Sequence, residues 1–538
     1  SIKISALTII GFNHSLATTL VISSTNSTIE ISDSLFEDNT LLPITTSEYH
    51  PGCISIDARN SSIVIFNCEF ADNDGGGAVD IVVEGRSNFT LLDIEAYHCS
   101  SPGNSFLIDS RAQDADQFVR IENLIAEHCY STGGGGVLKM YSADEAEVSF
   151  RNITARRNRA DGPGGAIWIS NSRNITIEDS VFEDNTAGTS GGALNFLASL
   201  PNLNRVNFTN NTAGFNGGGV VITTPLDITS SQYGFAFEDC HFTANTAIDM
   251  GGAAAHITSF VLVLLQNCTF IDNHRDGSGS LLGYGGALVV LTFGAIDMED
   301  CTFTNNTGYF TKAVDFHVAA NATNIQFTRV VASTSVFIDV GDGELEGIDS
   351  SRLDITTPHL NIFLTGNFTL DNVKQTVNYP GFVQLNTSVL LIPIPTLNQT
   401  GDVVTVMTYS GHEDEFANVS LVDPDGNTCK PAQMQYNQTA FQLQLQCEGM
   451  TGESGLSGGA IAGIVVGSVV GLTLLVVLIL MLIPKTRHAL LPHQGRKIDI
   501  MNTDHTPNTS HTTTEMKTQG DSPQMSPGWN TAQPNVMV

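Results

Sequence analysis

The chain has 538 residues, of which 50 are glycine and only 14% are charged, and its formal net charge is −32. The acidic excess lies before Gly459, where 51 Asp and Glu outnumber 18 Lys and Arg, a net charge of −33. Such a negative field repels nucleic acid and anionic lipid headgroups, so no nucleic-acid partner is predicted.

Two short motifs alternate through the first 310 residues. One is Phe-x-x-Asn, with degenerate copies that lack the Phe or carry Cys in place of Asn; the other is Gly-Gly followed by Ala or Val. The Asn or Cys position recurs eleven times between residues 13 and 306, about every 29 residues, which is typical of a solenoid. The Asn members of this series are Asn13, Asn39, Asn73, Asn158, Asn185, Asn211, Asn245, Asn273 and Asn306.

Strand patterning indicates which solenoid this is. Apolar and polar residues alternate with period two between the motifs, as in Ile29-Glu30-Ile31, and about 29 residues suit three short strands and three turns. Each Phe is expected to stack on the Phe of the next coil, and each buried Asn to bond unpaired backbone groups and the neighbouring Asn. The glycine pairs permit a tight corner with positive φ. We therefore predict an all-β fold, a parallel β-helix with about eleven motif-bearing coils in residues 1–310.

The alternating Phe-x-x-Asn and Gly-Gly-Ala repeats of residues 7–307 resemble those of chlamydial polymorphic outer membrane proteins. They also resemble the broader right-handed β-helix, pectin-lyase-like superfamily. The resemblance implies a right-handed parallel β-helix and an adhesive or recognition role. The chain departs from the bacterial proteins at its C-terminal end, where a single membrane helix is predicted. Surface proteins of microbial eukaryotes with this β-helix and one span are therefore the better analogy.

Residues 311–450 keep the apolar and polar alternation while the motifs fade. We predict degenerate coils followed by a C-terminal cap there, because the last coil of a solenoid is an edge that must be covered. Cys429 and Cys447 flank this cap and are predicted to form a disulfide.

Other cysteines fall at equivalent positions of neighbouring coils. Cys99 and Cys129 replace the motif Asn, and the coil spacing suits a disulfide between them in an oxidising compartment. The alternative is a column of buried free thiols. For Cys240, Cys268 and Cys301, which stack two residues before the Phe, the sequence does not decide the pairing.

Residues 459–483 form an uncharged apolar run, long enough to cross a hydrocarbon core of ~30 Å. Lys485 and Arg487 follow it, so the positive-inside rule places the preceding chain outside the cell and the C-terminus in the cytoplasm. We predict a juxtamembrane linker at 451–458, a transmembrane helix at 459–483 and a disordered tail at 484–538. Glycines on one helix face favour self-association of this segment, and they are Gly459, Gly463, Gly467 and Gly471.

Asn-x-Ser/Thr sequons are dense before the membrane segment, which is typical of a chain that has passed through a secretory pathway. Ser1 is not an initiator Met, so either a signal peptide has been removed or the chain is a fragment. The predicted location is the plasma membrane, with an extracellular ectodomain. The sequons include Asn13, Asn26, Asn60, Asn88, Asn152, Asn174, Asn207, Asn267, Asn321, Asn367, Asn386, Asn398, Asn418 and Asn437.

Pectin-lyase-like folds also include polysaccharide lyases and hydrolases. A lyase needs clustered carboxylates for Ca²⁺ and a nearby base, and a hydrolase needs paired carboxylates. Most of the candidates occupy recurring polar turn positions, so solvated turns are the preferred interpretation. No catalytic or cofactor-binding residue is assigned, and a metal, with Ca²⁺ as the candidate, stays open. The candidates are Asp72, Asp74, Glu183, Asp184, Arg156, Arg157 and Arg159, with His98 and His128 as metal ligands.

The preferred function is adhesion or recognition at the cell surface, with glycans or surface proteins as ligands. A β-helix presents long ladders and loops that suit extended ligands, and His274 to Tyr284 supplies one longer loop. The alternatives are a polysaccharide-degrading enzyme and a structural surface coat. Converging carboxylates beside a base would favour the enzyme, and an uninterrupted sequon-covered surface would favour the coat.

Overall fold

The computed structural model describes part of the chain, and all structural statements concern that part. It comprises residues 1–11, 13–14, 20–41, 53–75, 78–101, 106–110, 117–141, 146–225, 234–249, 251–276, 286–308, 314–321, 324–344, 351–364, 367–369, 377–378, 382–385, 389–393, 403–409, 411–413, 415–416, 418–422, 428–431, 434–438 and 440–444. Within these ranges the chain forms strands and turns without an α-helix. All of them belong to one compact unit, Ser1–Ile461.

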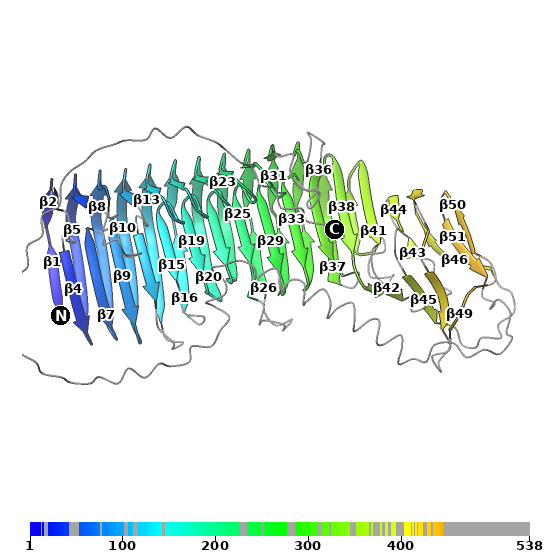
Figure 1. Cartoon of the computed structure of the whole chain (residues 1–538), viewed down its shortest axis with the longest axis horizontal. Helices are drawn as coiled ribbons and strands as arrows, with labels where there is room; N and C mark the ends of the chain where they lie inside the picture. Colours follow the sequence, from blue (N-terminus) through cyan, green and yellow to red (C-terminus); the bar gives the residue numbers. More distant parts are fainter. Residues whose placement is uncertain are drawn as a thin grey trace, which may run out of the picture. The chain divides into compact units, whose positions relative to one another are not determined.

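Sheet A is built from the segment that precedes each motif Asn, and its strands pair in parallel from coil to coil (Figure 1). The segment is a ten-residue strand in several coils and two shorter strands in others. Its strands are β1 (Ile2–Ser5), β2 (Thr8–Ile10), β5 (Thr28–Glu37), β8 (Ser62–Ala71), β10 (Asn88–Tyr97), β13 (Phe118–Glu127), β16 (Glu147–Arg151), β17 (Thr154–Arg156), β20 (Asn174–Glu183), β23 (Pro201–Thr209), β26 (Gly234–Glu238), β27 (His241–Thr243), β30 (Leu262–Gln266), β31 (Thr269–Ile271), β34 (Ile296–Glu299), β35 (Thr302–Thr304), β37 (Ile325–Ala332) and β40 (Leu353–Thr356).

Sheet B consists of two-residue strands that follow the motif Asn. They are β11 (Ser100–Ser101), β14 (Tyr130–Ser131), β18 (Arg159–Ala160), β21 (Thr186–Ala187), β24 (Thr212–Ala213), β28 (Thr246–Ala247) and β32 (His274–Arg275), and β3 (Asn13–His14) pairs with β6 (Thr40–Leu41) in the same way.

Sheet C follows the glycine pairs and extends furthest along the described coils. Its strands are β4 (Leu20–Thr25), β7 (Ile54–Arg59), β9 (Val79–Glu84), β12 (Phe106–Ser110), β15 (Leu138–Tyr141), β19 (Ile167–Ser170), β22 (Leu194–Leu197), β25 (Val220–Thr223), β29 (Ala255–Ser259), β33 (Leu288–Thr292), β36 (Val314–Ala320), β38 (Ser335–Val340), β41 (His359–Leu364), β44 (Phe382–Gln384) and β47 (Gly411–Glu413).

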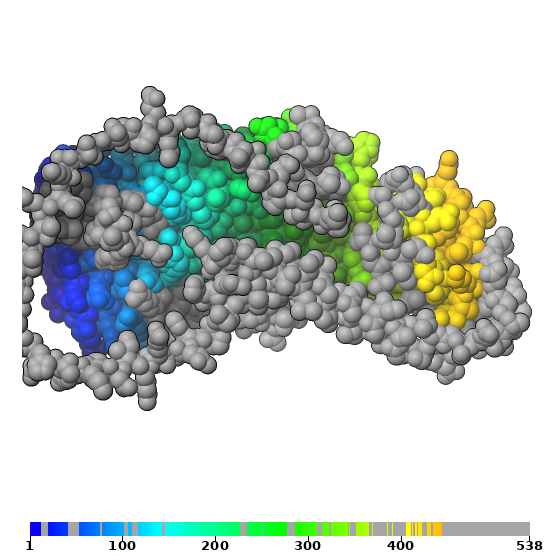
Figure 2. Space-filling model, viewed as in Figure 1, coloured from blue at the N-terminus to red at the C-terminus, as the bar shows by residue number. Residues whose placement is uncertain are grey.

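The core lies between these sheets and consists of columns of equivalent side chains. The described coils follow one another in sequence order from blue to yellow (Figure 2). Alternate strand residues point inward, and the motif Phe rings stack from coil to coil. Ring centroids are 4.7 Å apart for Phe208 and Phe242, and 4.9 Å apart for Phe242 and Phe270. The prediction of an all-β parallel β-helix is therefore confirmed, because the repeat places like residues in register.

The corner before sheet C requires glycine for two separate reasons. Gly164 has φ +71°, a left-handed conformation that favours glycine. At Gly165 the constraint is space, since a Cβ there would lie 2.0 Å from the carbonyl oxygen of Gly192 on the next coil. Backbone N–H groups of this corner also donate to the next coil, as from Gly165 to Gly191 O at 3.0 Å.

Beyond residue 311 the parallel pairing continues and then gives way to antiparallel strands. One further sheet comprises β39 (Gly343–Glu344), β42 (Asn367–Thr369), β45 (Val389–Pro393), β48 (Asn418–Val422) and β49 (Thr428–Cys429). Another comprises β43 (Val377–Asn378), β46 (Val403–Thr408), β50 (Met434–Asn437) and β51 (Ala440–Gln444).

The linker, membrane helix and tail predicted at 451–458, 459–483 and 484–538 lie outside the described residues, as do the four glycines of the predicted helix. In the part of the chain that the structure describes, no helix is long and apolar enough to span a membrane.

Candidate functional site

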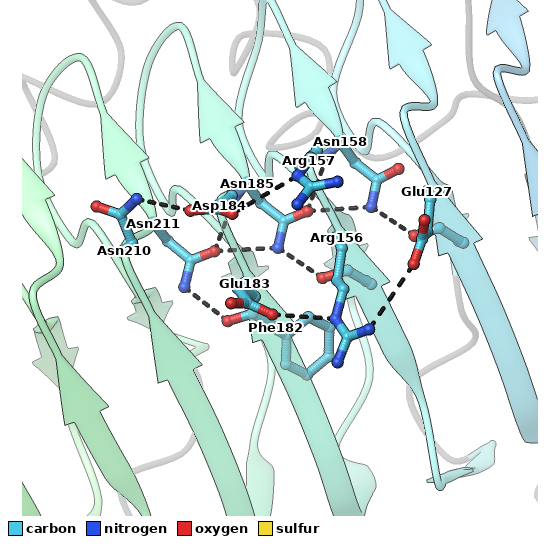
Figure 3. A network of polar contacts seen from close by, with 12 residues as sticks. Glu127, Arg156, Arg157, Asn158, Phe182, Glu183, Asp184, Asn185, Asn210 and Asn211 are labelled. Carbon is cyan, nitrogen blue, oxygen red and sulfur yellow. Dashed lines mark hydrogen bonds and ion pairs between the residues drawn. The ribbon is translucent and has the colours of Figure 1, made fainter.

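The motif Asn side chains form a continuous hydrogen-bonded column inside the bend between sheets A and B. Asn185 Nδ2 donates to Asn211 Oδ1 over 3.0 Å and to Ala155 O over 2.9 Å. The Asn185 backbone N–H donates to the same Oδ1 over 3.0 Å (Figure 3). These bonds satisfy backbone groups that the bend removes from the sheets, so the column stabilises the coil. The side chain of Asn13 lies outside the described part.

A carboxylate ends the column. Asn306 Nδ2 donates to Asp315 Oδ1 over 2.9 Å, and the Thr334 N–H donates to Asp315 Oδ2 over 2.7 Å. Asp315 is fully buried. The two oxygens of a carboxyl group both accept hydrogen bonds, so Asp315 suits a position where donors arrive from both sides.

Cys99 and Cys129 continue the Asn column as buried thiols, which is the second of the two alternatives that the sequence left open. The Cys99 thiol donates to Phe70 O over 3.5 Å and the Cys129 thiol to Ala96 O over 3.7 Å. Asn73 Nδ2 makes the same contact with Phe36 O at 2.9 Å, so each thiol takes the place of an Asn amide. A hydrogen bond with Cys129, together with burial, raises the pKa of Cys99.

The remaining cysteines divide into thiols and one disulfide. Cys240, Cys268 and Cys301 are buried free thiols, each donating to the backbone, as from Cys268 to Phe237 O at 3.4 Å. Cys429 is disulfide-bonded. Its predicted partner, Cys447, lies outside the described residues.

The predicted arginine cluster is divided among ion pairs that link neighbouring coils. Arg156 Nε lies 3.0 Å from Glu183 Oε2, and Arg157 Nε lies 3.8 Å from Asp184 Oδ2 (Figure 3). Arg159 instead pairs with Asp161 at 3.0 Å. The three guanidinium groups therefore do not converge on one point.

The other predicted turn residues occupy the same kind of position. Asp72 and His98 both have positive φ at the bend, and His98 Nδ1 lies 3.2 Å from Asp72 Oδ1. The ring of His98 stacks on that of His128, with centroids 5.1 Å apart. Asp74 instead bridges by its backbone to Thr40 and Ser100. Rings stacked face to face do not aim their nitrogens at a common ion.

A groove of 460 Å³ follows the outer bend of sheet A over the first described coils. Amides of the same bend bind the carboxylates of its acidic wall, since Asn67 Nδ2 donates to Asp33 at 2.6 Å and Asn123 Nδ2 to Asp93 at 2.7 Å. Glu95 also lines the groove. No set of three or more His, Cys, Asp or Glu side chains in the described ranges is arranged to hold a metal ion.

Among the described carboxylates with a clear pKa shift, Asp297 on β34 is the one whose pKa is raised, by burial and by Glu299. Both side chains point outward from sheet A. Glu299, however, pairs with Arg329 at 2.7 Å. Arg329 also lowers the pKa of Asp300 by hydrogen bonding. Sequence reasoning missed this pair because nothing in the repeat marks it.

The outward face of sheet C carries an aromatic cluster that is partly exposed. We call Lys139, Tyr141, Trp168 and Leu197 the aromatic platform. Lys139 lies beside Trp168 in the β15–β19 register, with Nζ 5.0 Å from the Trp168 ring centroid and 5.2 Å from that of Tyr141. The two rings meet edge to face at 5.1 Å.

The platform is accessible and chemically mixed. Tyr141 is 37% exposed and Leu197 is 46% exposed. Asn195 follows Trp168 in the same column on the next strand, and Ser170 separates Tyr141 from Leu197. Aromatic faces beside an ammonium group and an amide can bind the apolar face and the hydroxyls of a sugar ring. The sequence did not single out these residues, because they come together only through the strand register.

Comparisons with known proteins agree with this architecture. A family model described as the right handed beta helix region matches residues 81–290. The described coils therefore form a right-handed parallel β-solenoid. The chain is also 26% identical over 229 residues to the metabotropic glutamate receptor-like protein R of Dictyostelium discoideum. That match covers 42% of this chain and 13% of that protein, so the chain spans only a small part of the curated relative.

Proposed function

We propose that the chain is a cell-surface recognition protein whose β-helix binds an extended carbohydrate, or another surface ligand, on the outward face of sheet C. The observation that carries this proposal is the aromatic platform, in which the exposed Tyr141 and the partly exposed Trp168 lie beside Lys139. Aromatic side chains such as Trp and Tyr have only two rotatable χ bonds, so they anchor ligands at low entropic cost.

The surroundings support binding over a long surface. Successive strands of sheet C repeat the same outward positions, so a polymer can contact side chains of several coils along one face. The similarity to a receptor-like protein is compatible with a surface role. We further propose that the apolar run at 459–483 anchors the chain in the plasma membrane with the β-helix outside. Lateral association through the glycine face of that run belongs to the same proposal.

The bend residues favour a structural role over catalysis. Arg156 and Arg157 pair with the carboxylates of Glu183 and Asp184, so the base and acid candidates neutralise each other. Asp297 and Glu299 are the pair to substitute first if turnover is detected. A coat without a ligand remains the alternative that an absence of binding would favour.

The test is a carbohydrate and polysaccharide array probed with the purified full chain, with and without Ca²⁺. The same samples are assayed for unsaturated and reducing products. We expect binding without products, and Trp168→Ala should weaken it by about tenfold or more. Phe215→Ala, at a 45% exposed aromatic outside the platform, is the matched control. Product formation would overturn the recognition proposal in favour of an enzyme, and silence on the array would favour a coat.

A further inference from the structure

The sequons of the described coils differ in whether the folded chain has room for an N-glycan. In N-glycosylation the Asn Nδ2 forms a bond to C1 of a lipid-pyrophosphate-linked oligosaccharide. The C1–O bond to the pyrophosphate breaks, the pyrophosphate leaves with the electron pair, and Nδ2 loses one of its two protons. The folded chain can therefore carry an N-glycan at an exposed Asn in two cases. Either Nδ2 points to solvent, or Nδ2 donates one hydrogen bond that the N–H left after glycosylation can still make.

Asn60 and Asn88 meet this requirement at the edge where sheet C leads into sheet A. Both are exposed. The oxygen of each amide is held by the next coil, because the Arg86 N–H donates to Asn60 Oδ1 over 3.1 Å and the Phe118 N–H to Asn88 Oδ1 over 3.2 Å. Fixing Oδ1 against the protein turns Nδ2 of the same amide toward solvent.

Asn152 and Asn267 meet it at the outer bend of sheet A. Both are exposed and have positive φ. Asn152 Nδ2 donates to Asn123 Oδ1 over 2.8 Å, and Asn267 Nδ2 donates to Asp239 Oδ1. A glycosylated Nδ2 keeps one N–H, so the bond to the neighbouring coil and the glycan are compatible.

Sheet C lacks such sequons, unlike the turn into sheet A and the outer bend of sheet A. None of its described strands, from β4 to β47, contains the Asn of an Asn-x-Ser/Thr sequon. Asn195 and Asn361, which do lie on these strands, are followed two positions later by Leu197 and Phe363. Most of the described sequons fall on sheet A, on its bends and on the turns that border it, where Asn210 and Asn305 add two more. Those on strands of other sheets, outside sheet C, are Asn13 on β3, Asn367 on β42, Asn418 on β48 and Asn437 on β50.

We infer that N-glycans are attached at Asn60, Asn88, Asn152 and Asn267, and that they leave the outward face of sheet C open as the route of ligand access. The attachment sites rest on the proposed extracellular location of the β-helix and not on ligand binding. The second clause rests also on the proposed ligand binding, since it concerns access to the aromatic platform.

The sites are read by mass spectrometry of the full chain. The chain is produced behind a signal peptide in a eukaryotic host, and the surface-labelled fraction is treated with a glycan-releasing amidase in ¹⁸O-water. Release converts a glycosylated Asn to ¹⁸O-labelled Asp. We expect the label at all four residues and at no residue of sheet C. Unlabelled Asn60 and Asn88 in the surface fraction, or no chain in that fraction, would overturn the assignment.

Ligand access is tested with a glycan placed on the platform. Leu197→Asn creates an Asn-Ala-Ser sequon with Ala198 and Ser199, at a side chain that is 46% exposed. Leu197→Gln is the matched control without a sequon. We expect the glycosylated variant to bind the best array ligand at least about tenfold more weakly than the control, because the control already includes the effect of removing the Leu197 side chain from the platform. Equal affinity of both variants would refute the access route and leave the mapped sites standing.

Discussion

Removing one Asn from the buried column should destabilise its own coil far more than removing an exposed Asn beside it. Asn211→Ala deletes four hydrogen bonds. Asn211 Oδ1 accepts from the N–H and the Nδ2 of Asn185, each over 3.0 Å. Asn211 Nδ2 donates to Phe182 O over 2.9 Å and to Asn245 Oδ1 over 3.0 Å.

The magnitude follows from what the substitution leaves behind. Two donors of Asn185 lose their acceptor inside the protein, and Phe182 O loses a donor. A buried polar group without a partner costs about 1–3 kcal/mol, so three such groups would cost roughly 3–9 kcal/mol. We expect a loss of roughly 3–6 kcal/mol, because Asn185 Nδ2 keeps its bond to Ala155 O. Asn210→Gly is the control, because Asn210 is exposed, its side chain donates to Asp184 at 2.6 Å on the surface, and its φ is +53°. Its substitution should cost less than ~1 kcal/mol.

The assay is native-state hydrogen exchange of the peptide that contains the Asn185 amide, since a long repeat array need not unfold in a single step. A loss of about 4 kcal/mol would speed exchange there by roughly 10³-fold. Equal exchange in Asn211→Ala and Asn210→Gly would refute the view that the buried column stabilises the coil.

Three further predictions test other features of the fold. Burial lowers the pKa of His256 from 6.5 to about 4. Between these pH values His256 binds a proton in the unfolded chain but not in the folded chain, so the free energy of unfolding should fall by up to ~3 kcal/mol from pH 6.5 to 4. His256→Val introduces the residue found at the paired positions Val221 and Val289 of the neighbouring strands. It should abolish this pH dependence of the free energy of unfolding, measured by urea titration, and an unchanged pH dependence would show that other groups cause it. Gly165→Ala should lower the free energy of unfolding by about 3 kcal/mol, because its Cβ would lie 2.0 Å from a backbone oxygen. Gly341→Ala should leave it unchanged in the same titration, because the Cβ there would lie 3.3 Å from a side-chain oxygen. Burial raises the pKa of Cys53 to about 12, so a thiol reagent at neutral pH should label Cys53 only after unfolding, and rapid labelling of the native chain would contradict this.

The repeat made most of the fold predictable from sequence. Phe182, Phe208 and Phe242 recur at the coil period, and parallel strands in register place such residues in one column. The glycine corner was equally predictable from the Gly-Gly motif, because the φ of Gly164 favours glycine and the position of Gly165 leaves no room for a Cβ.

What the sequence left undetermined depends on side-chain direction and on contacts outside the period. Cys99 and Cys129 are in register, as a disulfide requires, but their thiols point to carbonyls of the preceding coils. Asp315 ends the Asn column although it follows Asn306 by only nine residues, a separation that the repeat does not predict.

Surface clusters were the least predictable feature. Arg156 and Arg157 are adjacent in sequence, yet each pairs with a different carboxylate of the next coil. Lys139 and Trp168 are far apart in sequence, and the β15–β19 register brings them together.

Affinity for the strongest array ligand, measured by calorimetry on the full chain and its Trp168→Ala and Phe215→Ala variants, tests the central claim most directly. The claim is that the outward face of sheet C is the recognition surface. It predicts a loss of about tenfold or more for Trp168→Ala and no change for Phe215→Ala. Unchanged affinity in Trp168→Ala, or equal losses in both variants, would contradict it.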